Sequence, residues 1–224
     1  MISPGKNCVK IFKAINRTTE VPLAIKVFQR KKGDNPSPHY VQEHKIASKI
    51  KHPYILNYHE FHTDAKSKSF KGPFNECSAI VMEYIPHGDL FTLVSKKNCC
   101  EKLARTFFHQ MVQAIEYLHE KEQIAHLDIK PENFLIHNTG IKLIDFDFSH
   151  KMDEPLNEGM KGTPGYRPPE LLSGGLKNLK SADIYSLGVV LFTIVVGWAP
   201  YEEIEESQDK FKFDKYYESL REDS

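Results

Sequence analysis

This 224-residue chain lacks the excess of one charge that marks many binding surfaces. Its 30 lysines and arginines balance 30 aspartates and glutamates, so the formal net charge is zero. Proteins that bind nucleic acid or an anionic membrane usually have a basic surface, and the balanced composition does not indicate such a surface. We therefore expect neither a nucleic acid nor a membrane among its partners.

Cysteine is scarce, and its spacing argues against both a disulfide framework and a zinc site. The four cysteines are Cys8, Cys77, Cys99 and Cys100, and none of them shows the spacing of zinc ligands. Adjacent cysteines rarely pair, so reduced thiols fit better than disulfides. The N-terminal residues show no signal-peptide pattern. These features predict a cytoplasmic protein, with the nucleus as the second candidate compartment.

Long apolar runs are missing as well. The most apolar stretch, residues 187–199, has thirteen residues, which is too short to cross a bilayer. It predicts instead a helix that is buried on all sides within a larger lobe. A chain of this length can bury a sizeable core, either as one larger domain or as two small lobes.

An ordered set of polar residues stands in the second half of the chain. The stretch His126–Asn133 reads HLDIKPEN, and Asp145-Phe146-Asp147 follows twelve residues after Asn133. Asp128 can accept the proton of an attacking hydroxyl, and Lys130 can neutralise charge on a phosphoryl group during transfer. A lone Asp in a loop is usually a cap or turn residue. The ordered set is far rarer than its parts, so it favours phosphoryl-transfer chemistry.

This set resembles the catalytic loop and the metal-binding loop of eukaryotic protein kinases. The resemblance implies ATP and Mg²⁺ as cofactors, Asp128 and Lys130 as catalytic residues, and Asn133 and Asp145 as ligands of the metal and the nucleotide. Amide and carboxylate oxygens suit Mg²⁺. It also implies an α+β, bilobal kinase-like fold, with a β-rich N-lobe over residues 1–85 and a mostly helical C-lobe over residues 86–224. The active site is then expected in the cleft between the lobes.

Two upstream segments extend the resemblance. The alternation of apolar residues from Val21 to Val27 predicts a strand, and its Ala24-Ile25-Lys26 resembles the family's Val-Ala-Ile-Lys, whose lysine contacts the α- and β-phosphates. Ser37 and Pro38 predict the start of a helix over residues 37–51, with Ser37 as N-cap. Glu43 on that helix matches the family's glutamate that pairs with the lysine, here Lys26.

The resemblance assigns further residues to the nucleotide. By alignment with the family's first strands and hinge, it implicates Ile11, Ala24, Met82, Glu83, Ile85 and Asp89. Met82 would lie behind the adenine, and the backbone of Glu83 and Ile85 would bond its edge. For Asp89, contact with the ribose or a basic substrate residue and a role as helix N-cap stay equal alternatives.

Residues 54–85 are expected to form strands around a polar loop, His62–Asn75, which reads as a solvated hairpin tip. A docking role for this loop is the alternative. Farther on, apolar residues repeat at helical spacing from Leu103 to Leu118, which predicts an amphipathic helix with a core stripe. From about residue 86 onward we expect mostly helices.

Two downstream segments complete the pattern. Residues 162–170, GTPGYRPPE, resemble the family's substrate-docking segment, with Pro168 in place of its Ala. Asp183, at the start of the Asp-x-x-Ser-x-Gly helix, would accept backbone N–H bonds from the catalytic loop. The motifs stand in the family's order and cover nearly the whole chain.

The sequence departs from the family at both ends. The family's Gly-x-Gly-x-x-Gly loop aligns with Pro4, Lys6 and Val9, and only Gly5 remains, one position off. Glycines there let backbone N–H groups approach phosphate, so ATP binding should be weaker, with Lys6 compensating in part. After Trp198 the family's last helices are not recognisable, which suggests truncation at both ends and an exposed apolar patch.

Two departures concern the active-site loops. Leu127 stands where many family members carry Arg, the residue that couples activity to phosphorylation of the following segment. In residues 149–162 only Ser149 carries a hydroxyl, so we expect little dependence on phosphorylation there. Asp147 replaces the motif's Gly. Asp tolerates the left-handed region, and a turn or cap role for Asp147 is favoured over a third metal ligand.

These features lead to a Ser/Thr protein kinase, most similar to the calmodulin-dependent kinase group, acting on protein substrates as a monomer. Glu132 and Asp89 suggest basic residues near the acceptor. One alternative is a catalytically weak pseudokinase that serves as a binding scaffold. Another is a small-molecule phosphotransferase of the aminoglycoside or choline kinase type, although that type lacks the Lys two residues after the catalytic Asp.

Overall fold

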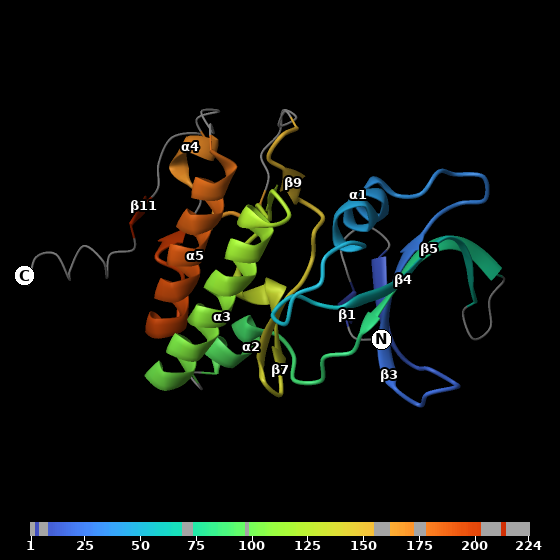
Figure 1. Ribbon diagram of the computed structural model, residues 1–224, viewed down its shortest axis with the longest axis horizontal. Coiled ribbons are helices and arrows are strands. Elements are labelled where there is room, and N and C mark those ends of the chain that lie inside the picture. Colours follow the sequence, from blue (N-terminus) through green and yellow to red (C-terminus); the bar gives the residue numbers. More distant parts are fainter. Residues whose placement is uncertain are drawn as a thin grey trace, which may run out of the picture. The chain divides into compact units, whose positions relative to one another are not determined.

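The computed structural model of the chain describes residues 3–4, 9–68, 74–96, 99–154, 162–172, 178–202 and 212–213 (Figure 1). It divides into two units. The first comprises Met1–Pro86 together with Asp145–Asp147, and the second comprises His87–Ile144 together with Phe148–Ser224. The first unit is β-rich and carries one helix, whereas the second is mostly helical. The predicted α+β fold class is therefore confirmed.

The first unit is built on an antiparallel sheet of five strands in the order β1-β2-β3-β5-β4. These strands are β1 (Ser3–Pro4), β2 (Val9–Ile15), β3 (Pro22–Gln29), β4 (Tyr58–Lys68) and β5 (Phe74–Glu83). Lys26 lies in the central strand β3, opposite Ile11 on β2 and Ile80 on β5. Hydrogen bonding on both sides holds the backbone of Lys26 in place.

The helix of the first unit, α1 (Pro38–Ala47), ends before the predicted residue 51. Ser37 occupies the N-cap position, but its side chain makes no capping hydrogen bond, so the predicted capping role is wrong. Aromatic contacts fasten α1 to the sheet: the Tyr40 ring meets Phe28 edge-on at 5.6 Å between centroids, and the His44 ring stacks on Phe61 at 4.4 Å. Packing, not capping, holds this helix.

The polar segment His62–Asn75 is mostly strand, so its prediction as a loop is wrong. β4 continues to Lys68 and β5 begins at Phe74, and these two residues are paired across the ribbon. In an antiparallel ribbon the backbone groups pair with each other while polar side chains face water. Polarity alone therefore did not exclude a strand.

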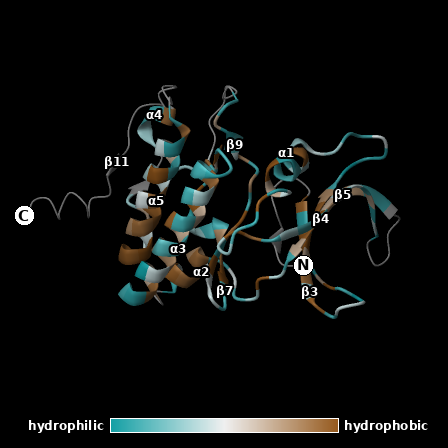
Figure 2. Ribbon diagram, viewed as in Figure 1, coloured by the Kyte–Doolittle hydropathy of each residue, from teal (hydrophilic) through white to brown (hydrophobic). Residues whose placement is uncertain are grey.

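The second unit contains four α-helices among its described residues. They are α2 (Leu90–Ser95), α3 (Glu101–Glu120), α4 (Pro169–Leu172) and α5 (Leu179–Val196). The predicted stripe on α3 is confirmed, because Phe107, Met111, Ile115 and Leu118 are buried. Figure 2 shows the contrast between α3, which alternates between polar and apolar residues, and α5, which is apolar along most of its length.

The helix α5 is capped at both ends. The Asn178 side chain accepts hydrogen bonds from the N–H groups of Lys180 and Ser181, and Gly197 ends the helix in the left-handed conformation, with φ of 100°. Its complete burial was predicted, and this is wrong. Val195, within the predicted range, is 65% exposed.

By length and hydropathy alone, α5 would qualify as a membrane span, as the core helices of many soluble proteins do. Its buried residues include Asp183, which is 0% exposed, and Ser186 and Thr193. The Asp183 carboxylate is bonded to the chain that precedes Asp128, as described below.

Short strand pairs frame the loops of the second unit. β6 (Ile124–Ala125) pairs with β9 (His150–Lys151), and β7 (Phe134–His137) pairs with β8 (Gly140–Leu143). A single 3₁₀ turn, η1 (Pro131–Asn133), precedes β7, and β10 (Tyr201–Glu202) pairs with β11 (Lys212–Phe213). Residues 126–130 thus run from β6 into η1, and residues 144–149 run from β8 into β9.

Candidate active site

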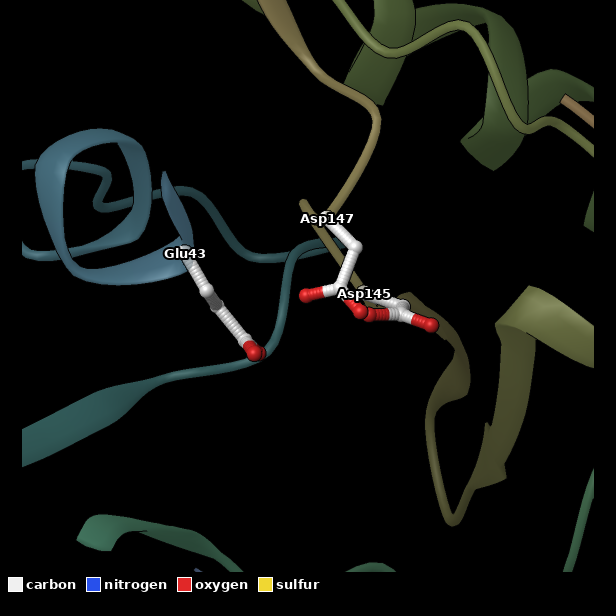
Figure 3. Close-up of side chains that lie close together, drawn as sticks. All are labelled: Glu43, Asp145 and Asp147. Atoms are coloured by element: carbon white, nitrogen blue, oxygen red, sulfur yellow. The ribbon is translucent and has the colours of Figure 1, made fainter. Parts of the chain in front are cut away.

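One ammonium group and three carboxylates meet in the first unit. Lys26 Nζ donates to Glu43 Oε2 at 2.7 Å and to Asp145 Oδ1 at 3.1 Å, and it lies 3.8 Å from Asp147 Oδ1. Tyr58 donates its hydroxyl to Glu43 Oε1 at 3.1 Å. Figure 3 shows the three carboxylates turned toward one another, and one oxygen of each lies within 4.8 Å of the other two. The Lys26–Glu43 pair expected from the sequence is present.

Burial and charge set the ionisation of this cluster. Burial alone would lower the pKa of Lys26, but the charges of Glu43, Asp145 and Asp147 outweigh it and raise that pKa above its ordinary value. Burial raises the pKa of Glu43 to about 7 against the opposing effect of Lys26, and the two aspartates add to the rise. The pKa of Lys26 and the pKa of Glu43 are both raised because three carboxylates lie near one ammonium group. The carboxylates together stabilise the charged Lys26, but Lys26 does not fully offset the burial and mutual repulsion of the carboxylates.

The raised pKa of Glu43 predicts a pH-dependent stability. The folded chain binds this proton more tightly than the unfolded chain, whose carboxyl has the ordinary value of 4.5. The resulting stabilisation is complete below pH 4.5 and is lost as the pH rises toward 7. Its size is about 3 kcal/mol in the free energy of unfolding. Urea unfolding at several pH values should show this slope, and the Glu43→Gln variant should lack it. An equal slope in both proteins would contradict the assignment.

A second polar cluster lies in the second unit, around Asp128. Lys130 Nζ is 2.8 Å from Asp128 Oδ2, and Thr163 donates its hydroxyl to Asp128 Oδ1 at 2.6 Å. Lys130 also donates to Thr163 Oγ1 at 2.6 Å. Asn133 Nδ2 donates to the Asp128 backbone oxygen at 2.7 Å and to its Oδ2 at 2.9 Å. Asp128 is 5% exposed, so three side chains orient a nearly buried carboxylate. The contact of Thr163 with Asp128 was not predicted from the sequence.

The loop that carries Asp128 is held by a buried network. Asp183 accepts the backbone N–H of His126 at Oδ2 and that of Leu127 at Oδ1, each at 2.8 Å, which is the brace expected from the sequence. The contact of His119 with Asp183 was not predicted from the sequence; His119 Nε2 lies 2.8 Å from Asp183 Oδ2. His119 stands four residues after Ile115 on the buried stripe of α3, and a His at such a position was the available signal.

His126 fixes the loop from the other side. Its Nδ1 accepts the backbone N–H of Asp128 at 3.3 Å, and its Nε2 lies 3.1 Å from the backbone oxygen of Ile144. The first contact requires a bare Nδ1, so the proton sits on Nε2 and is donated to Ile144. Ile144 N–H in turn donates to the Asn133 backbone oxygen at 2.9 Å. The residue before Asp145 is thereby tied to the loop of Asp128 and Asn133.

Leu127 adopts the left-handed conformation, with φ of 61°, which costs a non-glycine residue about 1 kcal/mol. Its side chain packs in an apolar cluster with Ala125 and Ala182, flanked by Phe148, Met152 and Leu179. An arginine there would have to bury its charge among these groups. The position usually occupied by Arg therefore contributes to the core of the second unit.

The segment after residue 161 passes close to this loop. A Cβ on Gly162 would lie 2.6 Å from the backbone oxygen of Leu127, so only glycine fits there. Arg167 donates from Nε and from its terminal nitrogen to the Gly162 backbone oxygen, at 2.9 Å and 2.7 Å. A small, shallow pocket opens beside Asp128, and its walls include Thr163, Tyr166 and Arg167.

The residues assigned to the nucleotide belong to the first unit, except Asp89 and Asn133, which belong to the second. Ala24, Met82 and Ile85 are buried, and Ala24 is paired with Met82. Ile11 lies opposite Lys26 on β2. The Glu83 N–H donates to the Asn57 backbone oxygen at 3.0 Å, so a ligand would have to use another backbone group of Glu83. Residues 5–8, which include Lys6, lie outside the described residues.

Asp89, in the second unit, is the N-cap of α2. Its Oδ1 accepts the N–H of Thr92 at 2.7 Å, which bears out the capping alternative and leaves the ribose contact a prediction. Asp147 lies in a turn, but the residue of this loop in the left-handed region is Asp145, with φ of 67°. Asp145, two residues before Asp147, is therefore the aspartate that takes the left-handed conformation in this loop.

The donor atoms present suit Mg²⁺. Glu43, Asp145 and Asp147 offer only carboxylate oxygens, with no thiolate or imidazole in the group, and hard oxygen ligands are those that Mg²⁺ prefers. Asn133 donates from Nδ2 to Asp128. Its Oδ1 is therefore the atom that could bind a metal ion. The assignment of Asn133 and Asp145 to the metal stays a prediction.

Comparisons with known proteins complete this description. The protein kinase domain family model matches residues 5–222. CBL-interacting protein kinase 26 of Oryza sativa subsp. japonica is 34% identical over 204 residues, which are 88% of this chain and 39% of that protein. CBL-interacting serine/threonine-protein kinase 18 of Arabidopsis thaliana is 32% identical over 199 residues, which are 86% of this chain and 36% of that protein. This chain thus spans less than half the length of these curated relatives.

A solved structure is similar as well. A chain in the crystal structure of the yeast RNA Pol II CTD kinase CTDK-1 complex matches with a TM-score of 0.73 and 26% identity, over 93% of this chain and 64% of that chain. The family model covers nearly the whole sequence. The Lys26–Glu43 pair and the loop of Asp128 contain the motifs that resemble this family. The chain belongs to the protein kinase domain family.

Proposed function

We propose that the chain is a Ser/Thr protein kinase that transfers the γ-phosphoryl group of Mg-ATP to hydroxyl groups of proteins. The observation that carries the proposal is the nearly buried Asp128, held by Lys130, Thr163 and Asn133. Orientation of a base by three donors matches a reaction whose catalysis is mostly positioning and electrostatic stabilisation. The printed names of the relatives, which are serine/threonine-protein kinases, support the same class.

Each side chain has a defined part in this reaction. Asp128 accepts the proton of the acceptor hydroxyl, and Lys130, 2.8 Å from it, neutralises charge on the transferring phosphoryl group. Lys26, oriented by Glu43, binds the phosphates of the nucleotide. Asp145 and Asn133 would hold Mg²⁺, which when bound neutralises the triphosphate. Thr163 keeps the Asp128 carboxylate turned in one direction through its 2.6 Å hydrogen bond.

A basic residue near the acceptor is the proposed substrate feature. Glu132 Oε2 is buried and receives no hydrogen bond within the described part of the chain. Glu132 also acts on Tyr166, which lines the pocket. Burial, with the charge of Glu132 adding to it, raises the pKa of the Tyr166 hydroxyl to about 12. A substrate lysine or arginine would satisfy this carboxylate. We also propose that this kinase is similar to the calmodulin-dependent group. The relatives are named for an interaction with CBL, and we propose that this chain binds a partner of that kind.

The test is Mg²⁺-dependent transfer of labelled γ-phosphate to Ser/Thr peptides, half of them with lysine or arginine near the acceptor. We expect transfer to the basic peptides, and its loss in the Lys26→Met variant, whose missing ammonium can no longer bind phosphate. The Glu132→Gln variant should lose the preference for basic peptides but still phosphorylate the others. No transfer by a folded chain would favour a binding scaffold instead.

We further expect activity that does not depend on phosphorylation of residues 149–162. Leu127 lies in an apolar cluster, where it can pair with no phosphate. Ser149, the only hydroxyl residue of that segment, is 0% exposed and donates to the His126 backbone oxygen at 3.2 Å. Specific activity should change less than about twofold after phosphatase treatment, since Leu127 brings no cation to which an added phosphate could bind. A large fall would contradict this prediction.

A further inference from the structure

Asp147 connects two elements of the first unit that no glycine at its position could connect. Its Oδ1 lies 3.8 Å from Lys26 Nζ on β3, and its Oδ2 lies 3.3 Å from His39 Nδ1 on α1. His39 and Glu43 are four residues apart on α1, so their side chains lie on the same face of the helix. Asp147 therefore contacts the face from which Glu43 reaches Lys26.

The first turn of α1 needs such a contact. Ser37 makes no side-chain capping bond, and the first turn contains no acidic residue, although both would stabilise the exposed N–H groups and the positive end of the helix. Asp147 brings a carboxylate to His39 in this turn from a distant part of the sequence. The rings of Tyr40 and His44 fasten the rest of α1 to the sheet.

We infer that Asp147 is a positioning residue, which holds α1 through His39 so that Glu43 stays paired with Lys26 when no nucleotide is bound. Asp147 also adds a third negative charge near Lys26, and repulsion from Glu43 and Asp145 opposes its attraction to the ammonium. The contact with His39 decides the balance in favour of the docked helix.

The test is hydrogen exchange of the α1 amides, residues 38–47, in the full chain without nucleotide. Asp147→Asn keeps the size of the side chain and removes its charge, and His39→Gln removes the other half of the contact. Each should raise exchange in α1 about threefold, the value of one half-exposed ion pair, with β3 and β5 unchanged. The double variant should exchange no faster than either single variant, because both remove one contact.

Matched controls are the exposed residues His62 and Asp153. His62→Gln and Asp153→Asn should leave α1 exchange unchanged. His39 is 42% exposed at its side chain, so His39→Gln keeps the fold and the test stays decisive if the Asp147 variant is unstable. Unchanged α1 exchange in His39→Gln, or a double variant whose effect is the product of the two single effects, would overturn the inference.

The catalytic consequence rests on the proposed function. Asp147→Asn and His39→Gln should raise the KM for ATP, by at most the roughly threefold factor expected for exchange, with kcat at saturating ATP unchanged, because the binding-competent lysine–glutamate pair is populated less often. A general loss of stability would not produce this split. Since the exchange experiment uses no nucleotide, an inactive chain would refute the proposed function and leave the role of Asp147 to be decided by exchange alone.

Discussion

Asp128→Asn is expected to lower kcat about a thousandfold and to leave the affinity for ATP nearly unchanged, since base catalysis of this kind contributes about that much. The amide has the size of the carboxylate but cannot accept the proton of the acceptor hydroxyl. Asp128 contacts Lys130, Thr163 and Asn133 of the second unit, whereas the lysine proposed to bind phosphate belongs to the first. Loss of the base should therefore affect turnover and not binding.

The experiment compares single-turnover transfer with nucleotide affinity measured by titration calorimetry. Thr163→Val is the matched control, because it removes the 2.6 Å hydrogen bond to Asp128 while the base remains. Its kcat should fall about tenfold, the usual cost of one lost hydrogen bond. Equal losses of ATP affinity and of turnover in Asp128→Asn would show that Asp128 acts in binding and would contradict its role as base.

Local motifs carried most of what could be predicted. The Lys26–Glu43 pair followed from the resemblance of the Ala24-Ile25-Lys26 strand and of the helix that carries Glu43 to the family's motifs, and the structure has it at 2.7 Å. Asp183 was expected to receive the N–H groups of the catalytic loop, and it does. In both cases a short spaced pattern specifies the residue, and family resemblance supplies the partner.

The contacts that escaped prediction join residues far apart in the sequence without any repeating pattern. Thr163 lies 35 residues from Asp128, and His119 lies 64 residues from Asp183. The contact of His39 with Asp147 also joins residues from distant parts of the sequence. Periodicity specifies which face of an element is buried, but not which polar group another element brings to it. The polar outer part of the β4–β5 ribbon was predicted as a loop for a related reason, because backbone pairing does not require apolar side chains.

Asp183→Asn is the substitution expected to reduce stability most. The carboxylate is 0% exposed and accepts the N–H groups of His126 and Leu127, with His119 Nε2 as a third neighbour. An asparagine has one acceptor oxygen, so in either orientation its NH₂ group would face a buried N–H donor. We expect the free energy of unfolding to fall by about 3 kcal/mol, the usual cost when one buried partner of a charged hydrogen-bond network is removed.

The loss should also be felt at the active site, because the two N–H bonds to Asp183 hold Leu127 in its left-handed conformation, with φ of 61°. Without them the loop can relax, and Asp128, the next residue, loses its orientation. Urea unfolding followed by circular dichroism gives the stability, and transfer measured well below the unfolding midpoint gives the activity. His119→Gln, which keeps a donor near Asp183, should cost only about 1 kcal/mol. If Asp183→Asn cost no more than that, the network would not be what holds the catalytic loop.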